Sequence, residues 1–95
     1  MHDLVIDHAM IVDGLGGPAR AGSVAVKDGR IAAVGTDAGP ATRRLDAHGL
    51  VLAPGIVDIH THYDAQLTWD PFATPSTALG VTTVVIGNCG FTIAP

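Results

Sequence analysis

Short apolar runs alternate with polar residues along the first half of the chain, with the period of two that is typical of half-buried strands. The pattern predicts strands at residues 4–6 and 10–12, separated by a polar break, and at residues 23–27 and 30–35. Asp28-Gly29 joins the last two and is a turn dipeptide of tight β-hairpins. Two more short strands are predicted at residues 44–47 and 49–53, about a turn at His48-Gly49. Residues 1–53 are therefore predicted to form a small all-β layer made of hairpins.

The pattern changes at Pro54, which we take as the boundary of a second region, residues 54–95. An apolar, β-branched run at residues 56–59 predicts a buried strand, and residues 65–72 predict an irregular loop. Thr74, Pro75 and Gly80 have the order of an N-cap, a first helical residue and a residue past the helix end, which predicts a short helix. A continuous β-branched run at residues 81–87 predicts a parallel strand buried on both faces. Strand, helix and strand in this order predict a βαβ unit.

A His-x-His pair, His60 and His62, closes the first of these two strands. Side chains two apart on a strand project from the same face, with Cα atoms roughly 6 to 7 Å apart, so the two imidazoles can share a metal ion. A strand that merely carries two exposed histidines fits a bare His-x-His pair equally well. The Pro54-Gly55 turn, Asp58 on the same strand and the Tyr63-Asp64 continuation favour a site.

The single cysteine, Cys89, lies just past the second predicted strand, in the turn Asn88-Cys89-Gly90. Because parallel neighbours end at the same edge of a sheet, the thiol is expected to approach the two imidazoles. The alternative is a small buried hydrophobe, the usual role of a free cysteine. The glycine-flanked turn favours a ligand. His8 and His48 have no partner at ligand spacing and are predicted to be ordinary surface or turn residues.

Composition narrows the classes of partner. The formal net charge is −4 and the five basic residues form no cluster beyond Arg43-Arg44, which argues against nucleic acid or an anionic membrane as partner. The N-terminus lacks the pattern of a secretory signal, no apolar run approaches the ~20 residues of a membrane span, and one cysteine makes no internal disulfide. A cytoplasmic location is expected.

Several stretches resemble the amidohydrolase superfamily and, within it, the N-acyl-D-amino-acid deacylase (D-aminoacylase) group. Those of the second region are residues 55–66, 69–71, 80–85 and 87–90. Residues 9–14, 29–31 and 45–47 resemble the small β-sandwich that precedes the barrel in these enzymes. The His-x-His strand is shared with hydantoinases, dihydroorotases and deaminases, whereas Asn-Cys-Gly after the second strand is narrower.

The resemblance implies a mixed α/β fold: a small N-terminal β-sandwich layer, then the first two strands of an incomplete (β/α)₈ barrel. It implies a zinc enzyme with one or two ions that hydrolyses the amide bond of N-acyl-D-amino acids with metal-activated water. His60 and His62 would bind at the looser metal position and Cys89 at the tighter one. Two alternatives stay open, a cyclic amide hydrolase of the hydantoinase or dihydroorotase type and a non-catalytic β module.

The chain departs from the family pattern at its end. The family's remaining histidine ligands and catalytic aspartate lie on later strands, beyond Pro95, and a barrel needs ~250 residues. Asp58, Asp64 and Asp70 are not assigned to that role. We therefore expect an amino-terminal fragment that binds metal weakly and is inactive alone. Its expected partners are an N-acyl amino acid substrate and either the missing barrel strands or further copies of the chain, since residues 81–86 have the composition of an aggregating edge strand.

Overall fold

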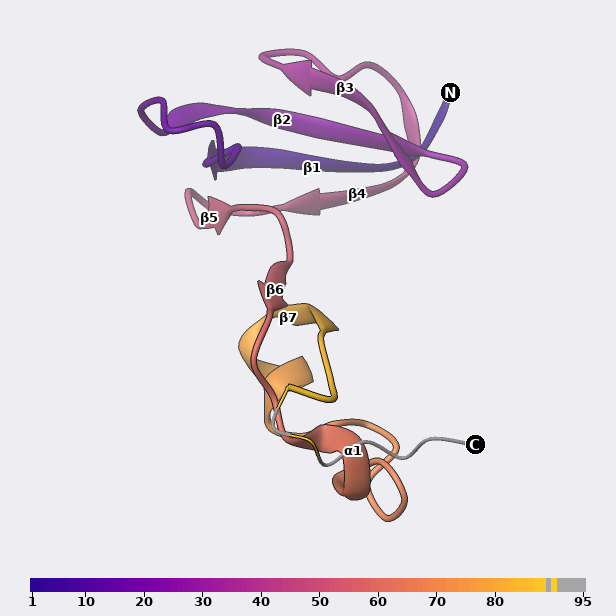
Figure 1. Cartoon of the computed structure of the whole chain (residues 1–95). Coiled ribbons are helices and arrows are strands. Elements are labelled where there is room, and N and C mark those ends of the chain that lie inside the picture. The colour runs from indigo at the N-terminus through magenta and orange to yellow at the C-terminus, as the bar shows by residue number, and fades with distance from the viewer. Residues whose placement is uncertain (89, 91–95) are drawn as a thin grey trace. The chain divides into compact units, whose positions relative to one another are not determined.

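The computed structural model describes residues 1–88 and 90. The chain divides into two compact units, Met1–Pro54 and Gly55–Pro95, and each is described by itself (Figure 1). Within the described residues, no helix is long and apolar enough to cross a membrane.

The first unit is one five-stranded sheet in the order β3-β2-β1-β4, with β5 also paired to β1. Neighbours β1 and β2 are antiparallel, as are β2 and β3, whereas β4 and β5 run parallel to β1. The strands are β1 (His2–Ile11), β2 (Arg20–Lys27), β3 (Arg30–Gly35), β4 (Ala41–Asp46) and β5 (Val51–Leu52). Among the described residues, this unit is therefore a single sheet, whereas the resemblance implied a small β-sandwich layer.

The hairpin predicted from Asp28-Gly29 is confirmed. Strands β2 and β3 pair in antiparallel register up to Lys27 and Arg30, and both turn residues have positive φ, 50° and 71°. The composition of this turn is enough to predict it, because Gly and Asp tolerate the left-handed region better than most residues.

Two predictions for this unit were wrong. The polar break between residues 6 and 10 does not divide two strands: β1 continues through it with a bulge between Ile6 and Ala9, where His8 has a φ of 52°. The layer is also not made of hairpins throughout, because β4 and β5 return parallel to β1. The bulge accommodates the polar residues Asp7 and His8 within the strand, so that the alternation of apolar and polar residues continues from Ala9 onward.

The core is thin and lies on both faces of the sheet. Val5, Ala25 and Ala38 pack on one face, and Ala9, Ile11 and Val24 on the other. On the second face, the register aligns Leu45, Ile6, Val24 and Val34 in one row across four strands. Leu45 and Val34 at the ends of this row remain 51% and 46% exposed, so the face is only partly covered.

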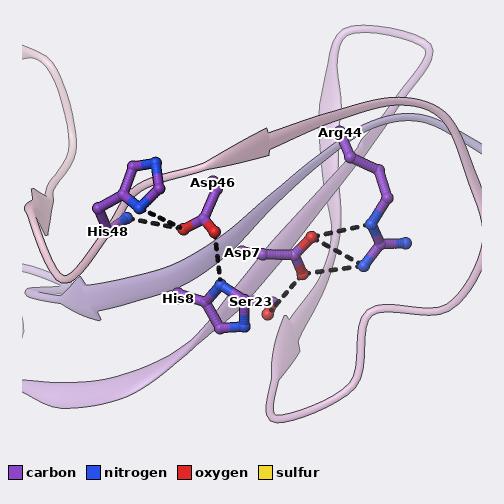
Figure 2. Close-up of polar contacts among 6 residues, drawn as sticks. All are labelled: Asp7, His8, Ser23, Arg44, Asp46 and His48. Atoms are coloured by element: carbon purple, nitrogen blue, oxygen red, sulfur yellow. Dashed lines mark hydrogen bonds and ion pairs between the residues drawn. The ribbon is translucent and has the colours of Figure 1, made fainter.

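Polar contacts fasten β4 and its following turn to the bulge of β1 (Figure 2). The Asp7 carboxylate accepts hydrogen bonds from the Arg44 guanidinium at 2.8 and 2.9 Å and from the Ser23 hydroxyl at 3.0 Å. Asp46 lies 3.0 Å from Nδ1 of His8 and accepts the backbone N–H of His48. These hydrogen bonds, that of His48 first, lower the pKa of the Asp46 carboxyl. Both histidines are largely exposed, in agreement with the prediction of surface or turn residues.

The second unit has two short parallel strands, β6 (Ile56–Asp58) and β7 (Val81–Val84), which confirms the predicted parallel pairing. Between them lie a short helix, α1 (Tyr63–Gln66), and a 3₁₀ helix, η1 (Ser76–Leu79). The predicted short helix is therefore present as a single 3₁₀ turn, and Gly80 follows its last residue as predicted, in the left-handed region.

Four details of the second unit correct the sequence predictions. The first strand ends at Asp58, before the histidines, and α1 occupies part of the segment expected to be an irregular loop. Pro75 is the N-cap of η1, where Thr74 was expected. Strand β7 stops at Val84 and leaves Thr82 and Thr83 exposed, because only β6 pairs with it among the described residues. Strand β7 is therefore not buried on both faces in the described structure, contrary to the prediction.

Candidate metal centre

The histidine pair lies in a short irregular segment between β6 and α1. Asp58, the last residue of β6, accepts the backbone N–H of His60 on Oδ1 at 3.1 Å. His62 is the N-cap residue of α1. The two imidazole rings are stacked, with centroids 5.5 Å apart and an angle of 24° between their planes. The segment thus brings together the two side chains that the sequence proposed as ligands.

The pairing has a different origin from the predicted one. A strand face does not hold the histidines, because β6 ends two residues earlier. Instead, Thr61 between them is buried and its hydroxyl donates to the carbonyl of Val85 at 2.8 Å. With Thr61 turned inward, His60 and His62 are both exposed. The His-x-His spacing carried this signal, although the element was assigned wrongly.

The segment that follows β7 runs beside the histidine segment. The backbone N–H of Val85 donates to the carbonyl of Asp58 at 2.9 Å. Farther along, the side-chain amide of Asn88 donates to the carbonyl of Ile59. The chain is thereby held next to β6 and its continuation up to Asn88. Cys89, the third predicted ligand, lies outside the described residues.

A pocket of about 250 Å³ opens beside the two imidazoles. It is lined by Asp58, His60, Thr61, His62, Tyr63, Gln66 and Ser76. Buried Tyr63 shares a hydrogen bond between its hydroxyl and that of Ser76, which joins α1 to η1. The sequence pointed to Tyr63 only as a neighbour of the site and missed Gln66 and Ser76, because the Tyr63–Ser76 contact joins positions apart in the chain.

Asp70 orders the loop between Gln66 and Ser76, two residues that line this pocket. Its carboxylate accepts the backbone N–H and the hydroxyl of Thr74, at 2.8 and 2.6 Å, together with the backbone N–H of Phe72. The Gln66 side chain donates to the same carboxylate and to the carbonyl of Thr74. These hydrogen bonds, that of the Thr74 hydroxyl first, lower the pKa of the Asp70 carboxyl.

The described residues fit part of a zinc site. Imidazole is a common zinc ligand, and two stacked rings beside an open pocket provide two nitrogen donors. Within residues 1–88 and 90, however, no group of three or more His, Cys, Asp or Glu side chains is arranged to hold a metal ion. A catalytic zinc usually takes three protein ligands, so a complete zinc site would need at least one further ligand from outside the described residues.

The amidohydrolase family model matches residues 43–95, more than half of the chain. The chain belongs to the amidohydrolase family. This confirms the resemblance drawn from the histidine strand and from Asn88-Cys89-Gly90.

Individual relatives agree with this assignment. The N-acyl-D-aspartate deacylase of Alcaligenes xylosoxydans xylosoxydans is 50% identical over 94 residues, which cover 98% of this chain and 19% of the relative. The crystal structure of an N-acyl-D-glutamate deacylase from Bordetella bronchiseptica, complexed with zinc and a phosphonate inhibitor, is 44% identical, with a TM-score of 0.88 over 99% of this chain and 20% of that one. A crystal structure of D-aminoacylase, also 44% identical, gives a TM-score of 0.91 over the whole chain and 20% of the relative. This chain thus spans about a fifth of the length of these deacylases.

Proposed function

We propose that this chain contributes metal ligands to an amidohydrolase that cleaves the amide bond of N-acyl-D-amino acids. The observation that carries the proposal is the stacked pair His60 and His62 at the end of β6, with the segment after β7 held beside it as far as Asn88. This arrangement occurs in a chain that is 44% to 50% identical to deacylases of N-acyl-D-amino acids. Cys89 follows Asn88 directly and is the proposed third ligand.

The proposal extends to the architecture. We take β6 and β7 as the first two strands of a (β/α)₈ barrel, with residues 54–95 opening that barrel and residues 1–53 forming the β layer before it. Support comes from the parallel pairing of β6 and β7, the connection between them and the position of the histidines at their carboxyl ends. Active sites of such barrels lie at the carboxyl ends of the strands.

Zinc is the proposed metal, because imidazole and thiolate are its preferred ligands. When bound, zinc would act as a Lewis acid and would lower the pKa of a coordinated water. The residues of this chain hold the metal and receive the substrate. His60 and His62 bind the metal as neutral imidazoles, and the pocket beside them receives the acyl amide. Asp58 and Thr61 fix the backbone on either side of His60, so that both rings keep their positions.

Metal titration of the 95-residue chain tests the ligand assignment. We expect weak zinc binding by the wild-type chain, and weaker binding by His60→Ala, His62→Ala and Cys89→Ser. Loss of an outer partner of a metal ligand already costs roughly 10- to 100-fold in affinity, and loss of a ligand should cost at least as much. His48→Ala is the matched control, since His48 is an exposed histidine of the first unit. Cobalt titration adds a thiolate charge-transfer band that only Cys89 can supply.

We expect no turnover by the chain alone, because it covers only about a fifth of the deacylases to which it is similar. The test exchanges this chain for the matching fifth of the Alcaligenes N-acyl-D-aspartate deacylase and assays hydrolysis of N-acetyl-D-amino acids and of cyclic amides. We expect the chimera to hydrolyse the N-acetyl-D-amino acids, His62→Ala to abolish this activity and His48→Ala to preserve it. A folded, zinc-loaded chimera without deacylase activity would contradict the proposal. So would full activity of the His62→Ala chimera.

A further inference from the structure

Gln66 is the last residue of α1 and lines the pocket beside the two imidazoles. Its side-chain nitrogen, Nε2, donates to Oδ2 of Asp70 at 3.2 Å and to the backbone carbonyl of Thr74 at 2.9 Å. Both partners only accept hydrogen bonds, because one is a carbonyl and the other is a carboxylate whose pKa is lowered. The side-chain amide therefore has one orientation that fits, with Nε2 toward the loop and Oε1 turned away from it.

The oxygen Oε1 of Gln66 is available to a ligand. No residue that the structure describes donates a hydrogen bond to it, and the buried atoms without a partner in the described part of the chain belong to other residues. Because Gln66 is only partly buried, Oε1 lies at an accessible surface. The pocket thus has a lining residue with an accepting oxygen whose direction is already set.

A second contact holds the same part of the loop. Tyr63 lies three residues before Gln66, and side chains at this spacing are neighbours on a helix surface. The Tyr63 hydroxyl shares a hydrogen bond with that of Ser76, while Gln66 binds the carbonyl of Thr74. Residues 74–76 are therefore fastened to α1 at two points, and the amide of Gln66 cannot turn over without losing two hydrogen bonds. Such pre-organisation lowers the cost of binding a ligand.

We propose that Oε1 of Gln66 accepts the N–H of the scissile amide, so that the site selects secondary amides over esters and tertiary amides; this rests on the function proposed above. In a trans amide the N–H and the C=O point in opposite directions, so this bond directs the carbonyl oxygen away from Gln66. An ester has no such hydrogen and places a second acceptor against Oε1, which leaves this oxygen without a donor.

Kinetics of the chimera with the Alcaligenes N-acyl-D-aspartate deacylase separate this contact from a structural role of Gln66. The substrates are N-acetyl-D-aspartate and O-acetyl-D-malate, in which an ester oxygen replaces the N–H. We expect Gln66→Met to lower the ratio of kcat/KM for the amide to kcat/KM for the ester by roughly 2- to 10-fold, the value of one hydrogen bond. The matched control, Asp70→Asn, loosens the same loop but keeps Oε1, and should leave this ratio unchanged. An active chimera with the same ratio in wild type and Gln66→Met overturns the inference.

A second measurement needs neither activity nor metal, so its failure is distinct from a failure of the proposed function. The side-chain carbonyl carbon of Gln66 gives one NMR signal in the zinc-free chain, because the sequence contains no other glutamine. We expect N-acetyl-D-aspartate at tens of millimolar to shift this signal, and O-acetyl-D-malate at the same concentration to leave it in place. Equal shifts from both compounds, or no shift from either, overturn the inference. A folded but inactive chimera together with the amide-specific shift would contradict the proposed function and support the Gln66 contact.

Discussion

Gly55→Ala is expected to loosen the strand pair that carries the histidine segment. Gly55 immediately precedes β6, and a Cβ atom built on it would lie 2.2 Å from both Oγ1 and Cγ2 of Thr82 and 2.7 Å from its Cβ. Non-bonded carbon atoms normally lie ~3.5 to 4.0 Å apart. A rotation about χ1 of Thr82 moves Oγ1 and Cγ2 but leaves Cβ in place, so the backbone of β7 has to shift.

The expected cost follows from this overlap. Forcing a methyl group into space that other atoms already occupy typically costs about 1 to 3 kcal/mol, and the overlap with the Thr82 Cβ places Gly55→Ala in that range. The free energy of opening the β6–β7 pair should fall by this amount, which corresponds to roughly 5- to 150-fold faster exchange of its amides. Zinc affinity should fall as well, because His60 is tied to the last residue of β6.

Hydrogen exchange measured by NMR separates this effect from general instability. The amide of Ile56, bonded to the Gly80 carbonyl, reports the second unit, and the amide of Met10, bonded to the Leu50 carbonyl, reports the first. Only the Ile56 amide should lose protection, whereas the Met10 amide should keep it. Gly17→Ala is the control, because no atom lies within 4 Å of a Cβ at that position.

A double-mutant cycle with Thr82→Gly completes the test, since Thr82→Gly removes the clashing atoms and should recover part of the loss. Unchanged protection of Ile56 in Gly55→Ala would refute the reasoning. The reasoning would also be refuted if Gly55→Ala lowered the protection of Ile56 equally in the wild-type chain and in the Thr82→Gly variant.

Two further predictions concern the second unit. Because its hydrogen bonds lower the pKa of Asp70 below the ordinary value of 3.8, the stability that this carboxylate contributes is present above pH 3.8 and is lost as the pH falls through the lowered pKa. Fluorescence of the adjacent Trp69 should report this acid transition, and Asp70→Asn should remove it. Separately, the uncovered strand β7 should drive concentration-dependent assembly, and Thr83→Lys should reduce it in sedimentation velocity runs.

Each of these predictions has a control. An identical acid transition in wild type and Asp70→Asn would show that another carboxylate governs it. Thr42→Lys introduces the same charge at an exposed position of β4 and should leave assembly unchanged. A wild-type chain that stays monomeric at high concentration, with a sharp and reversible thermal transition, would contradict the assembly prediction.

Local signals were sufficient for several features. The β2–β3 hairpin follows from Asp28-Gly29, the end of η1 from Gly80, and the family from the histidine strand with Asn88-Cys89-Gly90. Each depends on residues close together in sequence, whose backbone preferences or chemistry are almost independent of the rest of the molecule. For the same reason, the sequence predicted that His60 and His62 lie side by side, although the secondary structure predicted around them was wrong.

Only the tertiary structure decided how those pieces pair. Strands β4 and β5 lie parallel to β1 because hydrogen bonds form between segments far apart in the chain, which no local pattern specifies. Strand β6 ends before the histidines, and the Thr61 bond to Val85 fixes the backbone between them, again across a long separation. Asp64 shows the same division: the sequence gives its position, but only the folded chain buries the side chain and leaves its Oδ2 atom without a donor among the described residues.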